Sequence, residues 1–540
     1  MENRPDENRR DDLPPCATEF IQRVVRRMWY RRRARRDVQA ELTAHFEDAV
    51  RGCATAEEKE RKARELIEAF GDAKLLAALC HRAKKRCRPL WLKVLLRSGQ
   101  GLGVAFLYWT LCTLPILLGR PTIRVNYTEW LSNHWRPNGQ GVENAKSYYD
   151  KAVELYVEPP QGLEDKMRLR RWSLTGYYDE RDMQLIDQWL AKNQAAFDMV
   201  RHGASMPHYW PIYDSNESAP LEVSIVQSDL KMVEGYRPVA LAFKQQIICE
   251  ARRGEVAEAL DDCLVLRKFG RHLQNKGALN SQTGGISIEH LGYDSLIAIL
   301  QRPDVPSAIL ERIQKELVSD FDLNRQAISL DGEKALWYGI IQRTFTDDGQ
   351  GGGHALSQGF PYARGDWKHN LVNTFRFHYP DRRETVTMVE RYFQWAQGRL
   401  NAPPDRHERE KPDDSNQVSS LSIFFSITTP AYERVAQLAW RLKTHETAVV
   451  TLLAIQRYFR ANGNYPDNLY QLVEQGFLKE PSRDPFGQGT LSYRRADRGF
   501  ILYCWGSNFK DDGGQLGTDS QGSPRMWADN GDWVFWPVGP

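Results

Sequence analysis

One uncharged stretch constrains this chain more than any other feature. Residues 99–118 read GQGLGVAFLYWTLCTLPILL, without Asp, Glu, Lys or Arg. A helix of this length at 1.5 Å per residue is about 30 Å long, which matches the hydrocarbon layer of a membrane. The stretch therefore predicts a transmembrane helix at 99–119. The alternative is a buried core helix or an interfacial helix, because Gln100, three glycines and Pro115 lower the hydropathy.

Basic residues flank this stretch unevenly. Residues 82–97 are rich in Lys and Arg, whereas only Arg120 and Arg124 follow the stretch closely. Residues 1–98 hold 24 Lys and Arg against 16 Asp and Glu, and the rest of the chain holds 49 against 54. Because Lys and Arg accumulate on the cytoplasmic side of membrane proteins, we expect a single-pass protein with a cytoplasmic N-terminus. Its larger C-terminal region would lie outside the cytoplasm.

The segment before the uncharged stretch is predicted to be helical. Residues 1–15 are polar and contain proline, which is typical of a disordered tail. In residues 16–88, apolar residues recur at helical spacing. The three runs are Phe20, Val24 and Met28; Val38, Leu42, Phe46 and Val50; and Ala63, Leu66, Ile67 and Phe70. Gly71 marks a helix end, so several short helices are expected.

Two parts of this segment, RDVQAELTAHFEDAV and ARELIEAFGDAKLLAALC, carry a family resemblance. They are similar to the HAAS-type, or permease-prefix, helical domain of bacterial membrane proteins. In that family the domain precedes membrane segments and serves regulation or interaction. The resemblance implies a cytoplasmic docking or signalling cap, no catalytic residues, and a location at a bacterial inner membrane.

Two basic clusters, Arg26–Arg36 and Arg82–Arg97, are predicted to meet anionic lipid headgroups. Each Lys or Arg near such a surface contributes about 1 kcal/mol. The first cluster reads RRMWYRRRARR, and basic residues interleaved with aromatic ones are also compatible with nucleic acid. A plain solvated face is the third alternative. We expect lipid or solvent contact and no nucleic-acid partner.

The region 126–440 is predicted to be mainly helical. Residues 239–273 read as two amphipathic runs joined at Gly254, and they resemble a tetratricopeptide-like hairpin. A second copy at a period of about 34 residues is not found, so an irregular solenoid or bundle is expected. Two polar stretches, 346–359 and 401–420, are predicted to be surface loops or linkers.

The sequence carries no local catalytic motif such as HExxH or GxSxG. Its histidines are scattered along the chain, which lowers the expectation of an enzyme. Side chains that are distant in sequence can still meet in space. An extracytoplasmic hydrolase in the helical region therefore stays an alternative, and it would require histidines and carboxylates that converge.

The last hundred residues, 441–540, are predicted to form an α+β module. A long helix ends near Gly463, and two strand-like runs, TLSYRRA and GFILYCWG, follow as a hairpin. DWVFWPV is a candidate third strand. The fold class expected for the whole chain is mainly α, in several domains, with a small antiparallel sheet at the C-terminus.

The order GNYPDNLYQLV, DPFG, YRR and FILYCWGSNFKDDGG resembles the globular domain of the type II secretion major pseudopilin. In that family a long helix leads to a small antiparallel sheet, and a following loop holds calcium. The resemblance implies a calcium-binding interaction module. The N-terminal prepilin assembly helix of that family is not found before residue 441, which disfavours a pseudopilus subunit.

Calcium binding also has a physical basis in the stretch ILYCWGSNFKDDGGQLGTDS, because Ca²⁺ takes six to eight oxygen ligands. Asn508, Asp511, Asp512 and Asp519 are the candidate metal ligands. Carbonyls of Trp505 and Ser507 and the carboxylates of Asp529 or Asp532 are candidate additions. The alternative is a solvated turn in which Asp and Asn side chains bond to their own backbone.

Taken together, these features predict a membrane-anchored binding or scaffold protein of the bacterial envelope. Its terminal module would recognise a protein partner, with Ca²⁺ as the candidate cofactor. A transmembrane sensor with a cytoplasmic signalling cap and the extracytoplasmic hydrolase are the alternatives. The expectation is that the protein is not an enzyme.

Overall fold

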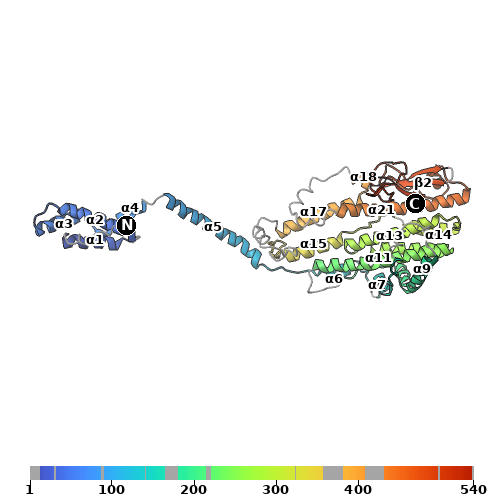
Figure 1. Cartoon of the computed structure of the whole chain (residues 1–540), viewed down its shortest axis with the longest axis horizontal. Helices are drawn as coiled ribbons and strands as arrows, with labels where there is room; N and C mark the ends of the chain where they lie inside the picture. The colour runs from blue at the N-terminus through green and yellow to red at the C-terminus, as the bar shows by residue number, and fades with distance from the viewer. Residues whose placement is uncertain are drawn as a thin grey trace. The chain divides into compact units, whose positions relative to one another are not determined.

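A computed structural model describes residues 13–28, 32–86, 90–139, 141–163, 180–213, 221–320, 322, 324–356, 381–407, 431–496 and 499–537. The chain forms two compact units (Figure 1). Unit 1 comprises residues 1–112, and unit 2 comprises residues 113–540. The described elements are mainly helices, with one small antiparallel sheet near the C-terminus, as the sequence predicts.

Unit 1 contains four short helices around a small apolar core. They are α1 (Pro15–Arg27), α2 (Arg32–Val50), α3 (Ala56–Phe70) and α4 (Ala73–Arg86). The apolar spacing gave the right buried faces, since Phe20, Val24 and Phe46 are all buried together. α3 begins where the Thr55 side chain accepts a hydrogen bond from the Glu58 N–H, and it ends at Gly71, which has a φ of 69°.

Helix α5 (Leu90–Leu118) contains the uncharged stretch. Its apolar side chains are exposed, with Leu102 at 72% and Phe106 at 66%. Across the part of the chain that the structure describes, no helix combines the length and the apolar character needed to cross a membrane. The prediction of a transmembrane helix at 99–119 is therefore wrong, and the predicted inner-membrane location loses its support. Three glycines and Gln100 dilute the apolar side chains at the start of the stretch.

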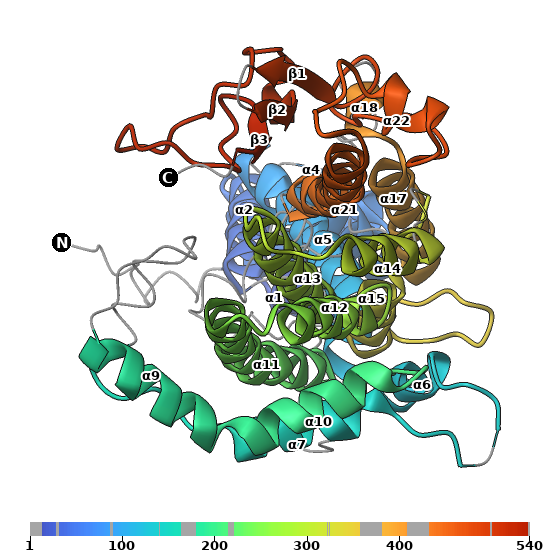
Figure 2. The same ribbon diagram turned by 90° about the vertical axis from the view of Figure 1, so that its right-hand side faces the viewer.

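Unit 2 is built on long helices that lie side by side. Its helices are α6 (Tyr127–His134), α7 (Ala145–Leu155), α9 (Glu180–Lys192), α10 (Gln194–Ser205), α11 (Leu221–Arg253), α12 (Val256–Leu273), α13 (Leu279–Leu300), α14 (Ser307–Ser319), α15 (Asp331–Thr344), α17 (Arg382–Asn401), α18 (Pro404–His407), α21 (Ala431–Asn462) and α22 (Tyr470–Glu474). Figure 2 shows α11, α12, α13 and α21 nearly end on, with α7, α9 and α10 on one side and the sheet on the other.

The predicted hairpin at 239–273 is confirmed as α11 and α12, which are joined at Gly254 with a φ of 86°. The closest helix approach, however, lies between α12 and α13. A Cβ atom on Gly270 would lie 2.5 Å from the Gly285 carbonyl oxygen and 2.5 Å from the Glu289 nitrogen. The backbones therefore touch at this level, and only glycine fits at position 270.

Replacement of Gly270 with alanine is expected to destabilise unit 2 by about 2–3 kcal/mol, because the added methyl group forces α12 away from α13. Gly398→Ala in α17 is the matched control, since its Cβ would meet nothing within 4 Å. Alanine should stabilise that helix slightly. Urea denaturation followed by circular dichroism measures both changes. Equal midpoints for the two variants would contradict the close approach.

The sheet contains β1 (Ser492–Ala496), β2 (Gly499–Cys504) and β3 (Trp533–Trp536) in the order β1-β2-β3. Both pairs are antiparallel, with Tyr493 opposite Leu502 and Tyr503 opposite Val534. The three strands confirm the strands expected from the sequence. β2 packs against α21, and the same helix also packs against α13, α14 and α17. The boundary expected at residue 440 thus falls inside one continuous helix.

The first residues of the stretch 346–359, which was predicted to be a surface loop or linker, form a closed loop. Phe345 and Ala355 form a β-bridge, and the Thr346 N–H donates to the His354 carbonyl at 2.9 Å. Asp347 forms ion pairs with Arg124 at 2.9 Å and with Arg382 at 2.7 Å. This loop is therefore fixed to α17 and to the segment before α6. Residues 357–380 and 408–430, which contain the rest of both predicted linkers, lie outside the described residues.

Candidate functional site

The predicted calcium ligands take part in hydrogen bonds within the C-terminal loops. The side chains of Asn508, Asp511 and Asp519 each accept a hydrogen bond from the backbone N–H two residues ahead, at 2.9–3.1 Å. Asp512 accepts from the Asn508 side-chain amide at 2.7 Å. Within the described ranges, no group of three His, Cys, Asp or Glu residues could hold a metal ion. The geometry fits the turn alternative, in which short polar side chains bond to their own backbone.

The two additional candidates, Asp529 and Asp532, have other roles. Asp529 pairs with Arg434 and Arg441 of α21 and accepts a hydrogen bond from the Ser507 hydroxyl at 2.7 Å. It thereby fixes the segment before β3 to α21. Asp532 is fully buried and accepts from the Gly514 N–H at 2.7 Å. Both carboxylates stabilise the fold of the C-terminal loops.

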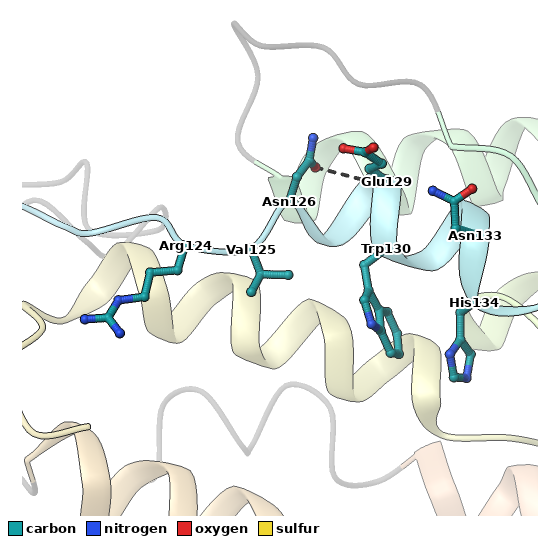
Figure 3. Close-up of a pocket in the computed structure, with 7 residues that line it drawn as sticks. All are labelled: Arg124, Val125, Asn126, Glu129, Trp130, Asn133 and His134. Atoms are coloured by element: carbon teal, nitrogen blue, oxygen red, sulfur yellow. Dashed lines mark hydrogen bonds between the residues drawn. The ribbon is translucent and has the colours of Figure 1, made fainter. Parts of the chain in front are cut away.

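A recess of 520 Å³ lies beside α6 and is open to solvent (Figure 3). The Trp130 and His134 rings stack with their centroids 4.3 Å apart. In Figure 3, Asn126 and Glu129 point to one side of the helix, whereas Trp130 and His134 point to the other. Because its polar groups do not converge, this recess lacks the arrangement expected of a specific ligand site.

A cluster of ionisable groups, most of them buried, lies where α12, α13 and α21 meet. We call it the charged centre. It consists of Arg267 and Arg271 from α12, Glu289 and Tyr293 from α13, Lys443 and Glu446 from α21, and Asp320 and Arg325 from the segment after α14. Ionic groups buried in a helical core carry a large desolvation cost, so such a cluster is a candidate functional site.

Glu289 anchors the charged centre from α13. Its side chain is 0% exposed, and its oxygens accept hydrogen bonds from the Tyr293 hydroxyl at 2.9 Å and from the Gln274 amide at 2.6 Å. Arg271 Nε forms an ion pair with it at 3.2 Å. Burial alone raises the pKa of Glu289, but Arg325, Arg271 and Arg267 outweigh burial and hold the pKa below its usual value. Glu289 is therefore ionised inside the helical body.

Glu446 is the buried carboxylate that α21 contributes to the charged centre, and its side chain is 1% exposed. It pairs with Arg267 Nη2 at 3.2 Å and accepts from Arg271 Nη2 at 3.0 Å. Arg267 is itself 1% exposed, and its Nε donates to the Tyr293 hydroxyl at 3.0 Å. Two buried carboxylates and two guanidinium groups thus join three helices through charge-assisted hydrogen bonds.

The charged centre holds more cationic side chains than Glu289 and Glu446 can balance. Arg325 adds a third guanidinium group, 21% exposed, whose distances of 3.6 Å to Glu289 and 3.9 Å to Glu446 are long for hydrogen bonds. Its Nε and Nη2 atoms donate no hydrogen bond within the described residues. Asp320 balances part of the charge through Arg267 and Arg271, but its side chain is 44% exposed.

Lys443 adds a fourth cation and is 5% exposed. Its ammonium group lies over the Trp440 ring, 4.1 Å from the centroid. Burial, and then the nearby Arg325, lower the pKa of Lys443 to about 8. Asp322 and Glu446 oppose this effect in part. Lys443 and Arg325 form the cationic edge of the charged centre, with Asp322 beside it, and Arg325 is partly exposed to solvent.

A second polar layer adjoins the charged centre on the same two helices. His290 follows Glu289 on α13, and His445 precedes Glu446 on α21. The Nδ1 atoms of the two histidines lie 2.8 Å apart, and the ring centroids are 5.0 Å apart. Asp294 Oδ1 lies 3.8 Å from His445 Nε2. The α13–α21 interface thus carries an ionic layer and a histidine layer side by side.

Sequence reasoning missed this interface. The sequence does contain a sign of it, the run RLKTHET at 441–447. This run has six polar residues and one leucine, and all seven are buried in the middle of α21. A polar run of this kind reads as a solvated face or a domain boundary when only hydrophobic periodicity is considered. Its seven residues cover two helical turns, so no side of the helix can be purely apolar there.

No family model, curated protein or solved structure matches this chain. The resemblances to the HAAS-type domain and to the type II secretion pseudopilin are therefore wrong as identifications. The sheet has only three strands, and α21 is built into the helical body. The short motifs that suggested the second family serve local structure, as Asp484 of the DPFG turn shows when it accepts a hydrogen bond from the Phe486 N–H at 2.8 Å.

Proposed function

We propose that the protein is a binding protein whose unit 2 holds an oxyanion, a phosphate or a carboxylate group, at the cationic edge of the charged centre. The observation that carries this proposal is the pair Arg325 and Lys443. Arg325 has two buried donor atoms without a hydrogen bond. Lys443 is a buried cation whose pKa is lowered to about 8 by burial and by Arg325.

A bound oxyanion would accept hydrogen bonds from the two Arg325 donors and would offset the charge of the buried Lys443. Guanidinium groups bind phosphate and carboxylate oxygens through paired N–H donors, and an adjacent ammonium group adds a point charge. The buried carboxylates Glu289 and Glu446 hold Arg267 and Arg271 from behind. The site is therefore preorganised, which reduces the ordering cost of binding.

Thermal denaturation at constant ionic strength tests this proposal with sulfate, phosphate and acetate against chloride. An anion at a hundredfold excess over its Kd should stabilise the wild-type chain by about 2.7 kcal/mol. Lys443→Met should abolish this response. The same substitution should raise the stability of the unliganded chain, because it removes a buried cation.

Lys315→Met is the matched control, because Lys315 lies on α14 with a side chain that is 73% exposed and pairs with Glu311. This variant should keep the full response to sulfate. An equal response in wild type and Lys443→Met would overturn the proposal, and so would the absence of any response beyond that of chloride.

The hydrolase alternative requires histidines and carboxylates that a substrate can reach. His290, His445 and Asp294 do lie together, but His445 is 0% exposed. The rings of Trp527 and Phe535 cover it. We therefore assign this group to the helix interface. The sensor alternative and the protein partner of the C-terminal module stay predictions.

A further inference from the structure

Residues from three parts of unit 2 shield the His290–His445 pair from solvent. Helices α13 and α21 carry the two rings themselves, and Phe535 of β3 stacks on His445 at 5.8 Å between centroids. Tyr293 of α13 lies against His445 at 5.3 Å, and the Trp527 ring lies 5.2 Å from His290 and 5.3 Å from His445. Trp527 belongs to a loop, and loops are displaced more easily than packed helices.

This loop, residues 515–532, is held by hydrogen bonds within itself and by contacts with the rest of unit 2. Its two ends meet at the Leu516–Asp532 bridge. Near its end, the Asp529 side chain pairs with Arg434 and Arg441 of α21 and accepts hydrogen bonds from Gln437 and Ser507. The Ala528 carbonyl accepts from the Trp533 indole N–H at 3.1 Å, and the Trp527 ring packs on the histidines and on Trp533. The contacts with α21 are thus made by loop side chains. The loop can therefore lift from α21 without unfolding of either helix.

The ionisable groups that face the histidine pair come from three helices. α13 contributes Glu289, Tyr293 and Asp294, α21 contributes Arg441, and α11 contributes Lys244 through its interaction with Asp294. Trp527 and Phe535 carry no charge. Burial lowers the pKa of His290 to about 4, with Glu289 opposing and Arg441 adding to this effect, and burial next to His290 lowers the pKa of His445 as well.

The short Nδ1–Nδ1 distance limits how many protons the pair can hold. One ring must donate its Nδ1 proton while the other ring accepts it. The donor ring can take one further proton on its Nε2 without loss of this contact. A second proton, on the accepting Nδ1, removes the only lone pair in the contact, so the hydrogen bond is lost. The imidazolium rings would then need water, which reaches them most easily if Trp527 moves away.

We propose that the His290–His445 pair and the loop 515–532 form a proton-sensitive latch, in which protonation of the pair releases the loop from α21 while α13 and α21 stay packed. The release exposes Trp527 and Met526, which are both half-buried before release, and it opens a path from solvent to the α13–α21 interface. This device is independent of anion binding at the charged centre.

Hydrogen–deuterium exchange of the full chain, corrected for the intrinsic effect of pH on exchange, tests the latch. Between pH 7 and pH 5, peptides from residues 515–532 should lose protection by about tenfold or more, whereas peptides from α13 should keep theirs. In the double variant His290→Gln and His445→Gln, the loop should be equally protected at both pH values. His354→Gln is the control, because His354 is exposed in the 346–356 loop, and it should behave as wild type.

The same loss of protection in the double variant would overturn the latch. Equal loss in the loop and in α13 of the wild type would also overturn it, because that result indicates global unfolding. If the double variant does not fold, Trp527→Ala provides a second test. It should leave the loop unprotected already at pH 7, and a loop that stays protected in this variant contradicts the role of Trp527.

Discussion

Replacement of Glu289 with glutamine is expected to lower the free energy of unfolding of unit 2 by about 3–5 kcal/mol, the range for breaking a buried ion pair from one side. The substitution leaves Arg271 and Arg325 without one of their two buried carboxylate partners. It also places amide hydrogens where the Tyr293 hydroxyl and the Gln274 amide now donate. Urea denaturation at pH 7 measures the loss.

Glu311→Gln on α14 is the matched control. Glu311 pairs with Lys315 at 2.7 Å and with Arg457 at 3.6 Å, but its side chain is 44% exposed. Exposed pairs of this kind contribute little to stability because solvent screens them. If Glu289→Gln costs no more than Glu311→Gln, then the charged centre is solvated and its role in the helical body is wrongly assigned.

The second large effect concerns Asp294 and pH. Burial raises the pKa of Asp294 to about 7, and Lys244 lowers it only in part. In an unfolded chain the same carboxyl has a pKa of about 3.9. A raised folded pKa means that the folded state is favoured while the group is protonated. This stabilisation is complete below pH 4 and is lost as the pH rises through 7, by about 4 kcal/mol in total.

Asp294→Asn does not titrate, so the variant should gain stability relative to wild type as the pH rises from 4 to 8. Urea denaturation at five pH values measures the difference. Asp261→Asn is the control, because its side chain is 52% exposed and pairs with Arg312. Parallel stability curves for wild type and Asp294→Asn would contradict the burial of this carboxyl beside His445.

Much of the fold follows from local periodicity. The apolar spacing of Phe20, Val24 and Phe46 predicted the buried faces of unit 1, and the alternation in GFILYC predicted β2. Both patterns indicate a helix or strand with one apolar face. They succeed where one side of an element is buried and the other is solvated.

The candidate site could not be predicted in this way. Lys443, His445 and Glu446 are buried, yet such residues normally mark a solvated face. Their partners Arg267, Glu289 and Arg325 come from positions more than a hundred residues earlier, and each of them alone has an ordinary context in the sequence. Only the packing of α12, α13 and α21 brings opposite charges within 4 Å.

The prediction of a transmembrane helix failed for a related reason, whereas calcium binding stays a prediction. The composition of residues 99–118 showed an absence of charge, but absence of charge is not the same as sufficient apolar character. The Asp and Asn residues of the C-terminal loop had the composition of a calcium site. Composition does not distinguish oxygens that converge on a cation from oxygens that cap their own turns, as Asp511 and Asp519 do.

Isothermal titration calorimetry with sulfate at pH 8 measures directly whether Arg325 and Lys443 bind an oxyanion. Sulfate does not titrate near this pH, whereas Lys443, with its pKa of about 8, is partly deprotonated. Bound sulfate should raise that pKa, so binding should take up protons, which appears as a heat that depends on the ionisation enthalpy of the buffer. We predict one sulfate per chain with proton uptake that is lost in Lys443→Met. Binding without proton uptake, or no binding in the wild-type chain, would show that Lys443 and Arg325 do not hold an oxyanion.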